Sequence, residues 1–135
     1  MQLVTLDFDG DERFQTLRKD LGATSLGINL LRLQPGQRGR IHRHAEQEEV
    51  YVVLEGVLTL LVEGEPHELR SGQAARVGPE ERRQLTNPAR ERCVLLALGA
   101  TGEHPGRDGE AFESWDDERG RPPQEVPLPA DLRLD

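Results

Sequence analysis

The stretch GQRGRIHRHAEQEEVYVVLEG, residues 36–56, decides how this chain folds and where its chemistry lies. It places His42 and His44 two residues apart, with Glu49 five residues further on. Side chains alternate along a strand, so the two histidines project to the same face. A bulge or turn over residues 45–48 brings Glu49 back opposite them. Two imidazoles and one carboxylate that converge in this way favour a divalent transition metal with open positions for water or substrate.

Short apolar runs punctuated by Gly and Pro extend on both sides of this stretch. No long helical period separates them, so they predict an antiparallel sandwich or small barrel. The pattern over residues 12–21 fits either a helical turn or a strand. The eight strands predicted from the runs cover residues 26–34, 39–43, 50–54, 57–62, 67–69, 74–77, 83–87 and 93–98.

Three zones divide the chain: an N-terminal strand or extension over 1–25, a barrel over 26–100, and a polar C-terminal arm over 101–135. The arm holds five of the nine prolines and therefore predicts irregular structure without a core of its own. Its aromatic residues, Phe112 and Trp115, are expected to attach it to the barrel or to a second subunit. A lid over a pocket is the alternative.

Composition limits the function classes. The chain has 135 residues, which is one domain, and its formal net charge of −8 argues against binding to nucleic acid or to anionic membranes. No stretch is apolar enough for a signal peptide or a transmembrane span, so the expected location is cytoplasmic. The single cysteine, Cys93, excludes an internal disulfide and is expected to be a buried, inert thiol.

The spacing from Gly36 to Gly56 resembles the first conserved motif of the cupin superfamily, and a second motif follows from Gly72 to Asn87. This resemblance to small single-domain cupins implies an all-β, antiparallel jelly-roll β-barrel with a pocket inside. It also implies that His42, His44 and Glu49 bind a metal, with Mn, Fe, Ni and Zn as the candidates. Solvent-exposed histidines on an arginine-flanked strand, with no metal, are the simpler interpretation.

The second motif departs from the family pattern at the position that normally supplies a third histidine, where this chain has Arg83. A guanidinium group stays protonated and has no free lone pair, so Arg83 cannot coordinate a cation. Either Arg83 turns away and leaves a 2-His-1-Glu set, or it points inward and pairs with Glu49. The remaining histidines, His67 and His104, are expected to be exposed.

Alternation along the strands proposes further pocket residues. If Glu49 faces inward, Tyr51 does too, although the only tyrosine in an apolar strand can equally be a core residue. If Arg83 faces inward, so does Leu85. A register slip of one residue would exchange these for Arg82 and Gln84, so Gln84 is also a candidate pocket residue.

Three function classes remain open on the sequence. The first is a metal-dependent enzyme, such as a dioxygenase or isomerase, that transforms a small molecule. The second is a non-catalytic, metal-free module that binds a small anionic or polyol ligand through Arg83. The third is a structural or regulatory subunit whose barrel is filled by apolar side chains. The resemblance also implies a homodimer formed through sheet faces, with 50–54 and 57–62 as the surface.

Overall fold

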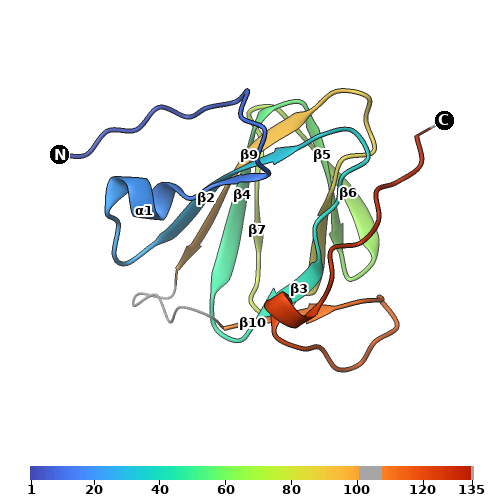
Figure 1. The fold of residues 1–135 in the computed structure, drawn as a ribbon. Helices are drawn as coiled ribbons and strands as arrows, with labels where there is room; N and C mark the ends of the chain where they lie inside the picture. Colours follow the sequence, from blue (N-terminus) through green and yellow to red (C-terminus); the bar gives the residue numbers. More distant parts are fainter. Residues whose placement is uncertain (101–107, 135) are drawn as a thin grey trace.

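Two five-stranded antiparallel sheets face each other in the computed structural model, which describes residues 1–100 and 108–134 (Figure 1). The first sheet has the order β1-β2-β9-β4-β7, and the second has the order β10-β3-β8-β5-β6. The elements are β1 (Phe14–Gln15), α1 (Leu17–Leu21), β2 (Gly27–Leu33), β3 (Ile41–His44), β4 (Glu48–Glu55), β5 (Val57–Val62), β6 (Glu65–Arg70), β7 (Ala74–Val77), β8 (Arg83–Thr86), β9 (Cys93–Ala100), β10 (Gly109–Phe112) and the 3₁₀ turn η1 (Pro123–Glu125).

The main core lies between the sheets and is built by alternation along the strands. On β4, Tyr51 and Val53 are buried, and on β5, Leu58 and Leu60 are buried. The core also contains Leu33, Leu69, Val77, Leu85, Cys93 and Leu95. This two-sheet arrangement confirms the antiparallel jelly-roll barrel. Burial raises the pKa of the Cys93 thiol to about 12, which agrees with the inert thiol expected.

A tight turn at Gly56 passes the chain from one sheet to the other. Gly56 has φ of +79°, and a Cβ there would stand 2.3 Å from the carbonyl oxygen of Arg92. Only glycine combines this left-handed backbone with such a close approach. The glycine that ends the first motif is therefore required by the crossing from β4 to β5.

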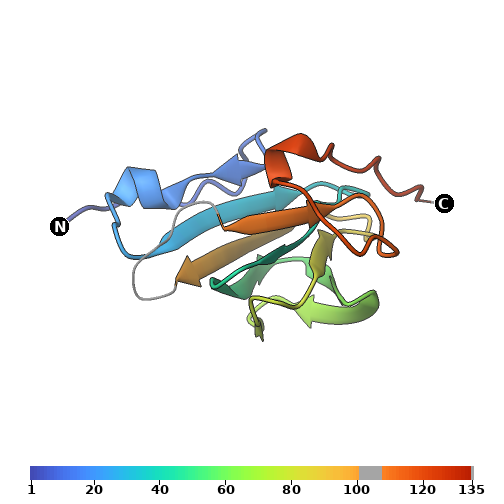
Figure 2. The same ribbon diagram turned by 90° about the horizontal axis from the view of Figure 1, so that it is seen from below.

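The strands at β5 and β7 have the predicted bounds, whereas the two ends of the chain differ from the sequence pattern. The undecided segment over 12–21 forms both a short strand and a short helix, β1 and α1. The C-terminal arm is not wholly irregular, because Gly109–Phe112 pairs with β3 as strand β10. This strand extends the second sheet at its edge. It is the orange arrow in the view from below (Figure 2).

The C-terminal arm packs on its own barrel. Phe112 is buried, and the guanidinium groups of Arg43 and Arg82 lie 5.2 and 5.5 Å from the centre of its ring. Further along, Leu132 donates its amide to the carbonyl oxygen of Gly36, and Arg38 donates to the carbonyl oxygen of Ala130. These contacts hold the arm along the segment that precedes β3.

A second, smaller core covers part of the outer face of the first sheet. Leu17, Leu30 and Val94 are buried there beneath Val4, Leu6 and Phe8 of the N-terminal segment. Leu54, one of the residues expected on a dimer surface, packs against this cluster. The chain therefore covers part of that face itself. Within the described ranges, no helix has the length and apolar character needed to cross a membrane.

Candidate metal centre

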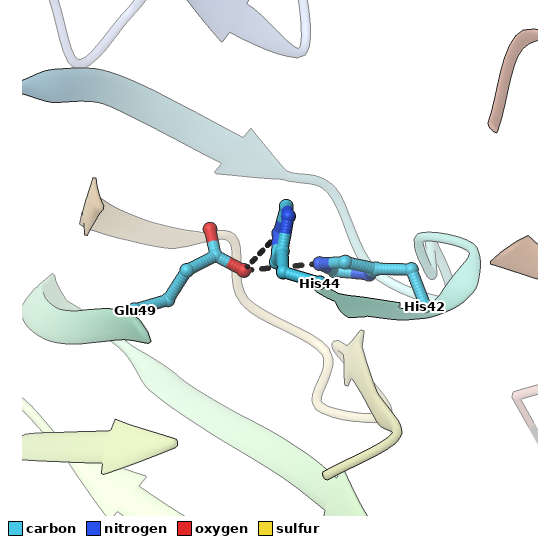
Figure 3. A group of neighbouring side chains, drawn as sticks. All are labelled: His42, His44 and Glu49. Atoms are coloured by element: carbon cyan, nitrogen blue, oxygen red, sulfur yellow. Dashed lines mark hydrogen bonds and ion pairs between the residues drawn. The ribbon is translucent and has the colours of Figure 1, made fainter. Parts of the chain in front are cut away.

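Three side chains from two strands of different sheets meet in the interior between the sheets (Figure 3). His42 and His44 come from β3, and Glu49 comes from the start of β4. The short connection between the two strands crosses from one sheet to the other, which brings the carboxylate to face the imidazoles. The ligand atoms of the three residues all lie within 4.8 Å of one another.

A single carboxylate oxygen is the centre of this cluster. Oε1 of Glu49 lies 3.1 Å from Nε2 of His42 and 2.9 Å from Nε2 of His44. Transition metals bind imidazole nitrogen and carboxylate oxygen at about 2.1 Å, so neighbouring ligand atoms at right angles are about 3 Å apart. The two distances therefore match the spacing of adjacent ligands around one ion.

The other ring nitrogen of each histidine also faces an oxygen. Nδ1 of His42 lies 3.2 Å from the carbonyl oxygen of Arg40, and Nδ1 of His44 lies 2.7 Å from Oδ1 of Asp108. Asp108 in turn accepts hydrogen bonds from the amides of Glu46 and Gln47. A carboxylate or carbonyl behind the imidazole is the usual support of a metal-ligating histidine, since it fixes the tautomer that leaves Nε2 free to coordinate.

The oxygens beside the four ring nitrogens show whether these residues fit a metal. A neutral imidazole has one N–H and one lone pair, yet each ring here has an oxygen beside both nitrogens. Each ring therefore needs either a second proton or a cation between its Nε2 and Glu49. The donor set and its supporting oxygens fit a divalent transition metal.

The electrostatics of the cluster agree with a bound positive charge. Burial alone would raise the pKa of Glu49, but hydrogen bonds from His42 and His44 and their charge hold this pKa well below its usual value. For His44, burial lowers the pKa, and contacts with Glu49 and Asp108 outweigh this and raise it. The carboxylate is therefore ionised at neutral pH, and its negative charge faces both rings.

Arg83 points inward and lies behind Glu49. Its side chain is fully buried, and Nη2 lies 3.5 Å from Oε1 of Glu49. Nη1 donates to the carbonyl oxygens of Pro79 and Glu81, whereas Nε and Nη2 have no hydrogen-bond partner among the described residues. Arg83 thus supplies a positive charge where the resemblance led us to expect a ligand. Because it is fully buried, it is not placed to anchor a ligand, as the metal-free alternative requires.

The other two candidate pocket residues lie on different faces. Tyr51 is buried and donates its hydroxyl to Oε1 of Glu49 at 2.9 Å. Burial, followed by the charge of Glu49, raises the pKa of Tyr51 well above its usual value, so the hydroxyl stays protonated. Gln84 faces away from the cluster and donates to the carbonyl oxygen of Gly39. Leu85, not Gln84, shares the inward face with Arg83, and this settles the register.

A cavity of about 380 Å³ opens onto the cluster. His42, His44, Glu49 and Tyr51 form part of its wall, and Arg83 and Gln84 are not among the described residues that line it. The apolar side chains between the sheets therefore do not fill the interior completely, as a purely structural subunit would require. Gln84 instead lines a smaller cavity under the C-terminal arm. His67 is exposed on β6, and His104 lies outside the described residues.

Four further residues contribute to the site and were not predicted from the sequence. Asp108 orients His44, and Gln47 closes the cavity beside Gly99. Arg13 and Arg40 line the cavity from the segments before β1 and β3. Of these, only Arg40 carried a usable signal, since it precedes His42 by two residues and so belongs to the same face of an extended chain.

Comparison with known families gives one match that covers just over half of the chain. The family model described as "Cupin domain" matches residues 29–99, which contain both motifs and all three candidate metal ligands. No curated protein matches the chain.

Solved structures share the fold. A Silicibacter pomeroyi protein described as a sugar phosphate isomerase from a cupin superfamily is 26% identical, with a TM-score of 0.65 over 88% of this chain and 81% of that one. An Acidithiobacillus ferrooxidans protein, provisionally described as a sugar phosphate isomerase, is 26% identical with a TM-score of 0.60. That match covers 64% of this chain but only 57% of the other. A Bacteroides fragilis cupin protein is 22% identical, with a TM-score of 0.63 over 75% of this chain and 86% of that one, and supports the fold alone.

Proposed function

Because the chain belongs to the cupin domain family, we propose that it binds one divalent transition metal, Mn, Fe, Ni or Zn, through His42, His44 and Glu49 and acts on a small molecule in the adjoining cavity. The observation that carries this proposal is the oxygen behind each imidazole. Arg40 and Asp108 present acceptors to both Nδ1 atoms and so direct both Nε2 atoms at the same carboxylate oxygen.

Isomerisation of a small sugar phosphate is the reaction class that we propose. Two relatives at 26% identity carry that description, and the cavity combines a metal-type donor set with polar wall residues. A bound ion would polarise a carbonyl or hydroxyl oxygen of the substrate. Glu49 would hold the ion, and Tyr51 would keep that carboxylate in place through its hydroxyl.

The charge of Arg83 favours a second candidate, a metal-free binding module whose ligand contacts the cavity wall and not Arg83 itself. Its guanidinium already balances the charge of Glu49 at 3.5 Å. Two opposite charges about 4 Å apart attract by roughly 4 kcal/mol at an effective dielectric constant near 20, and a divalent ion beside Arg83 is repelled on a similar scale. We therefore propose that the metal affinity is weaker than that of a site with a third histidine.

Metal titration tests the proposal. Chelator-treated protein is expected to take up about one Mn, Fe, Ni or Zn ion per chain and to melt at a higher temperature when loaded, because an ion that binds only the folded state stabilises it. The double variant His42→Ala/His44→Ala should lose uptake, whereas His67→Ala, which changes the exposed histidine of β6, should keep it. Calorimetry and elemental analysis measure both, and the loaded protein is then assayed with a panel of sugar phosphates.

Two results would count against this function. Equal metal uptake by the wild type and the double variant would place the ion elsewhere. No uptake, together with stabilisation by a small ligand without turnover, would support the metal-free module instead.

We also propose that two chains associate through the part of the first sheet's outer face that the N-terminal segment leaves open. Val50 and Val52 lie there, on β4, and both are partly exposed. A protein with one small core is stabilised when such an interface buries additional apolar surface. Sedimentation that shows only a 15.1 kDa species at micromolar concentration would exclude the homodimer.

A further inference from the structure

The wall of the cavity carries the opposite charge to the rest of the chain. Three arginines, Arg13, Arg18 and Arg40, line it, and Glu49 is the only acidic residue among the described residues of the wall. The chain as a whole has a net charge of −8. A basic cavity in an acidic protein concentrates anions at that place and repels them elsewhere.

None of the three cavity arginines has an ion-pair partner within residues 1–100 and 108–134, whereas Arg43, Arg76, Arg82 and Arg92 all pair with acids. Arg13 donates Nη1 to the carbonyl oxygen of Arg38, and Arg40 donates Nε to the carbonyl oxygen of Val126. These bonds hold each guanidinium in place through one nitrogen. Within the described residues, the other nitrogens of the two groups make no hydrogen bond, and a guanidinium has five N–H donors in all.

Arg13 and Arg40 influence each other electrostatically across the cavity. The pKa of Arg13 is lowered, mainly because its guanidinium is partly buried. The negative charge of Asp131 raises this pKa in part, and the positive charge of Arg40 lowers it further. A phosphate or carboxylate bound in this cavity would be attracted by both positive charges.

The position of Arg40 relates this charge to the metal cluster. Arg40, His42 and His44 follow one another at intervals of two residues and all line the same cavity. An extended chain rises about 3.3 Å per residue, so Arg40 lies about 7 Å along the chain from His42. A small molecule with its anionic end at Arg40 can therefore present its other end to the cluster.

Gln47 supplies an independent sign of a ligand. Its side chain lines the cavity and is only 7% exposed, and Oε1 has no hydrogen-bond partner among the described residues. A buried amide oxygen without a partner costs stability. A hydroxyl group of a ligand in this cavity would satisfy it.

We propose that Arg13 and Arg40 form an anion subsite that takes the phosphate or carboxylate end of the ligand, with Gln47 accepting a hydrogen bond from one of its hydroxyl groups. Arg18, which is exposed on α1, adds attraction at the entrance. Only one part of this inference rests on the proposed function, namely that the other end of the ligand meets the metal cluster. Anion binding itself requires no metal.

The test is calorimetric titration of the full chain with inorganic phosphate and, separately, with acetate, both metal-loaded and after chelator treatment. Phosphate is expected to bind in both states, and whichever anion binds more tightly identifies the preferred group. Arg13→Gln/Arg40→Gln should weaken phosphate binding at least tenfold, because each substitution removes charge-assisted hydrogen bonds. The exposed Arg119→Gln serves as the matched control and should bind like the wild type.

Two further variants keep the test decisive if the glutamine pair folds poorly. Arg13→Lys/Arg40→Lys keeps the charges and should retain most of the binding, and Arg18→Gln should weaken it only slightly. Phosphate binding that needs the metal and ignores both arginines would overturn the subsite, as would no binding at millimolar phosphate. Binding that depends on the arginines in a protein that takes up no metal would support the subsite and reject the proposed metal function.

Discussion

Glu49→Gln is expected to abolish metal uptake and to destabilise the fold by about 3–5 kcal/mol, the range measured when one member of a buried ion pair is removed. Oε1 of Glu49 is the shared partner of His42, His44 and Tyr51, and it is the counter-charge of Arg83. Glutamine keeps the shape but loses the charge. Arg83, which is fully buried, would then be a cation without compensation.

The neighbouring residue provides the control for this change. Glu48 is exposed and pairs with Arg76 at the surface, so Glu48→Gln should cost at most about 1 kcal/mol. Urea unfolding of the two variants, each without metal, measures the difference. If Glu49→Gln unfolds at the same urea concentration as Glu48→Gln, Glu49 does not balance the charge of Arg83.

Arg83→His is expected to raise metal affinity at least about 100-fold. The substitution removes a positive charge that lies 3.5 Å from the candidate ligand atom of Glu49 and introduces a neutral nitrogen donor. Repulsion between a unit charge and a divalent ion about 5 Å apart is several kcal/mol at an effective dielectric constant near 20, and a factor of 100 needs only part of it. Without metal, the variant should be less stable than the wild type because Glu49 loses its counter-charge.

The matched control is Arg82, the residue just before β8. Arg82 faces away from the cavity and pairs with Glu63, so Arg82→His should leave metal affinity unchanged. Calorimetric titration with Zn or Ni compares the two variants with the wild type. Equal affinities for Arg83→His and the wild type would mean that the guanidinium does not oppose the ion.

The sequence predicted the barrel because the signals of its strands and turns each lie within a short stretch of the chain. Short apolar runs bounded by glycine and proline define β5 and β7 to the residue, and the spacing of His42, His44 and Glu49 was visible within one short stretch. Alternation also linked Tyr51 to Glu49 and Leu85 to Arg83, and the register in the structure agrees with it.

The remaining parts of the site depend on contacts between distant segments, which no local pattern records. Strand β10 consists of the residues GEAF, and it exists because β3 offers them an unpaired edge. Asp108 reaches His44 across 64 positions of the chain. Arg13 enters the same cavity from the N-terminal segment, where its neighbours show no pattern that points to a pocket.

The wall of the cavity runs from Arg13 to Leu128 and so draws on nearly the whole chain. No fragment, and no partly unfolded form that has released either end, can retain that wall intact. A molecule bound in this cavity would therefore act on the global unfolding equilibrium of the chain. In hydrogen exchange, such a ligand would protect the amides of both sheets together, including strands that never touch it.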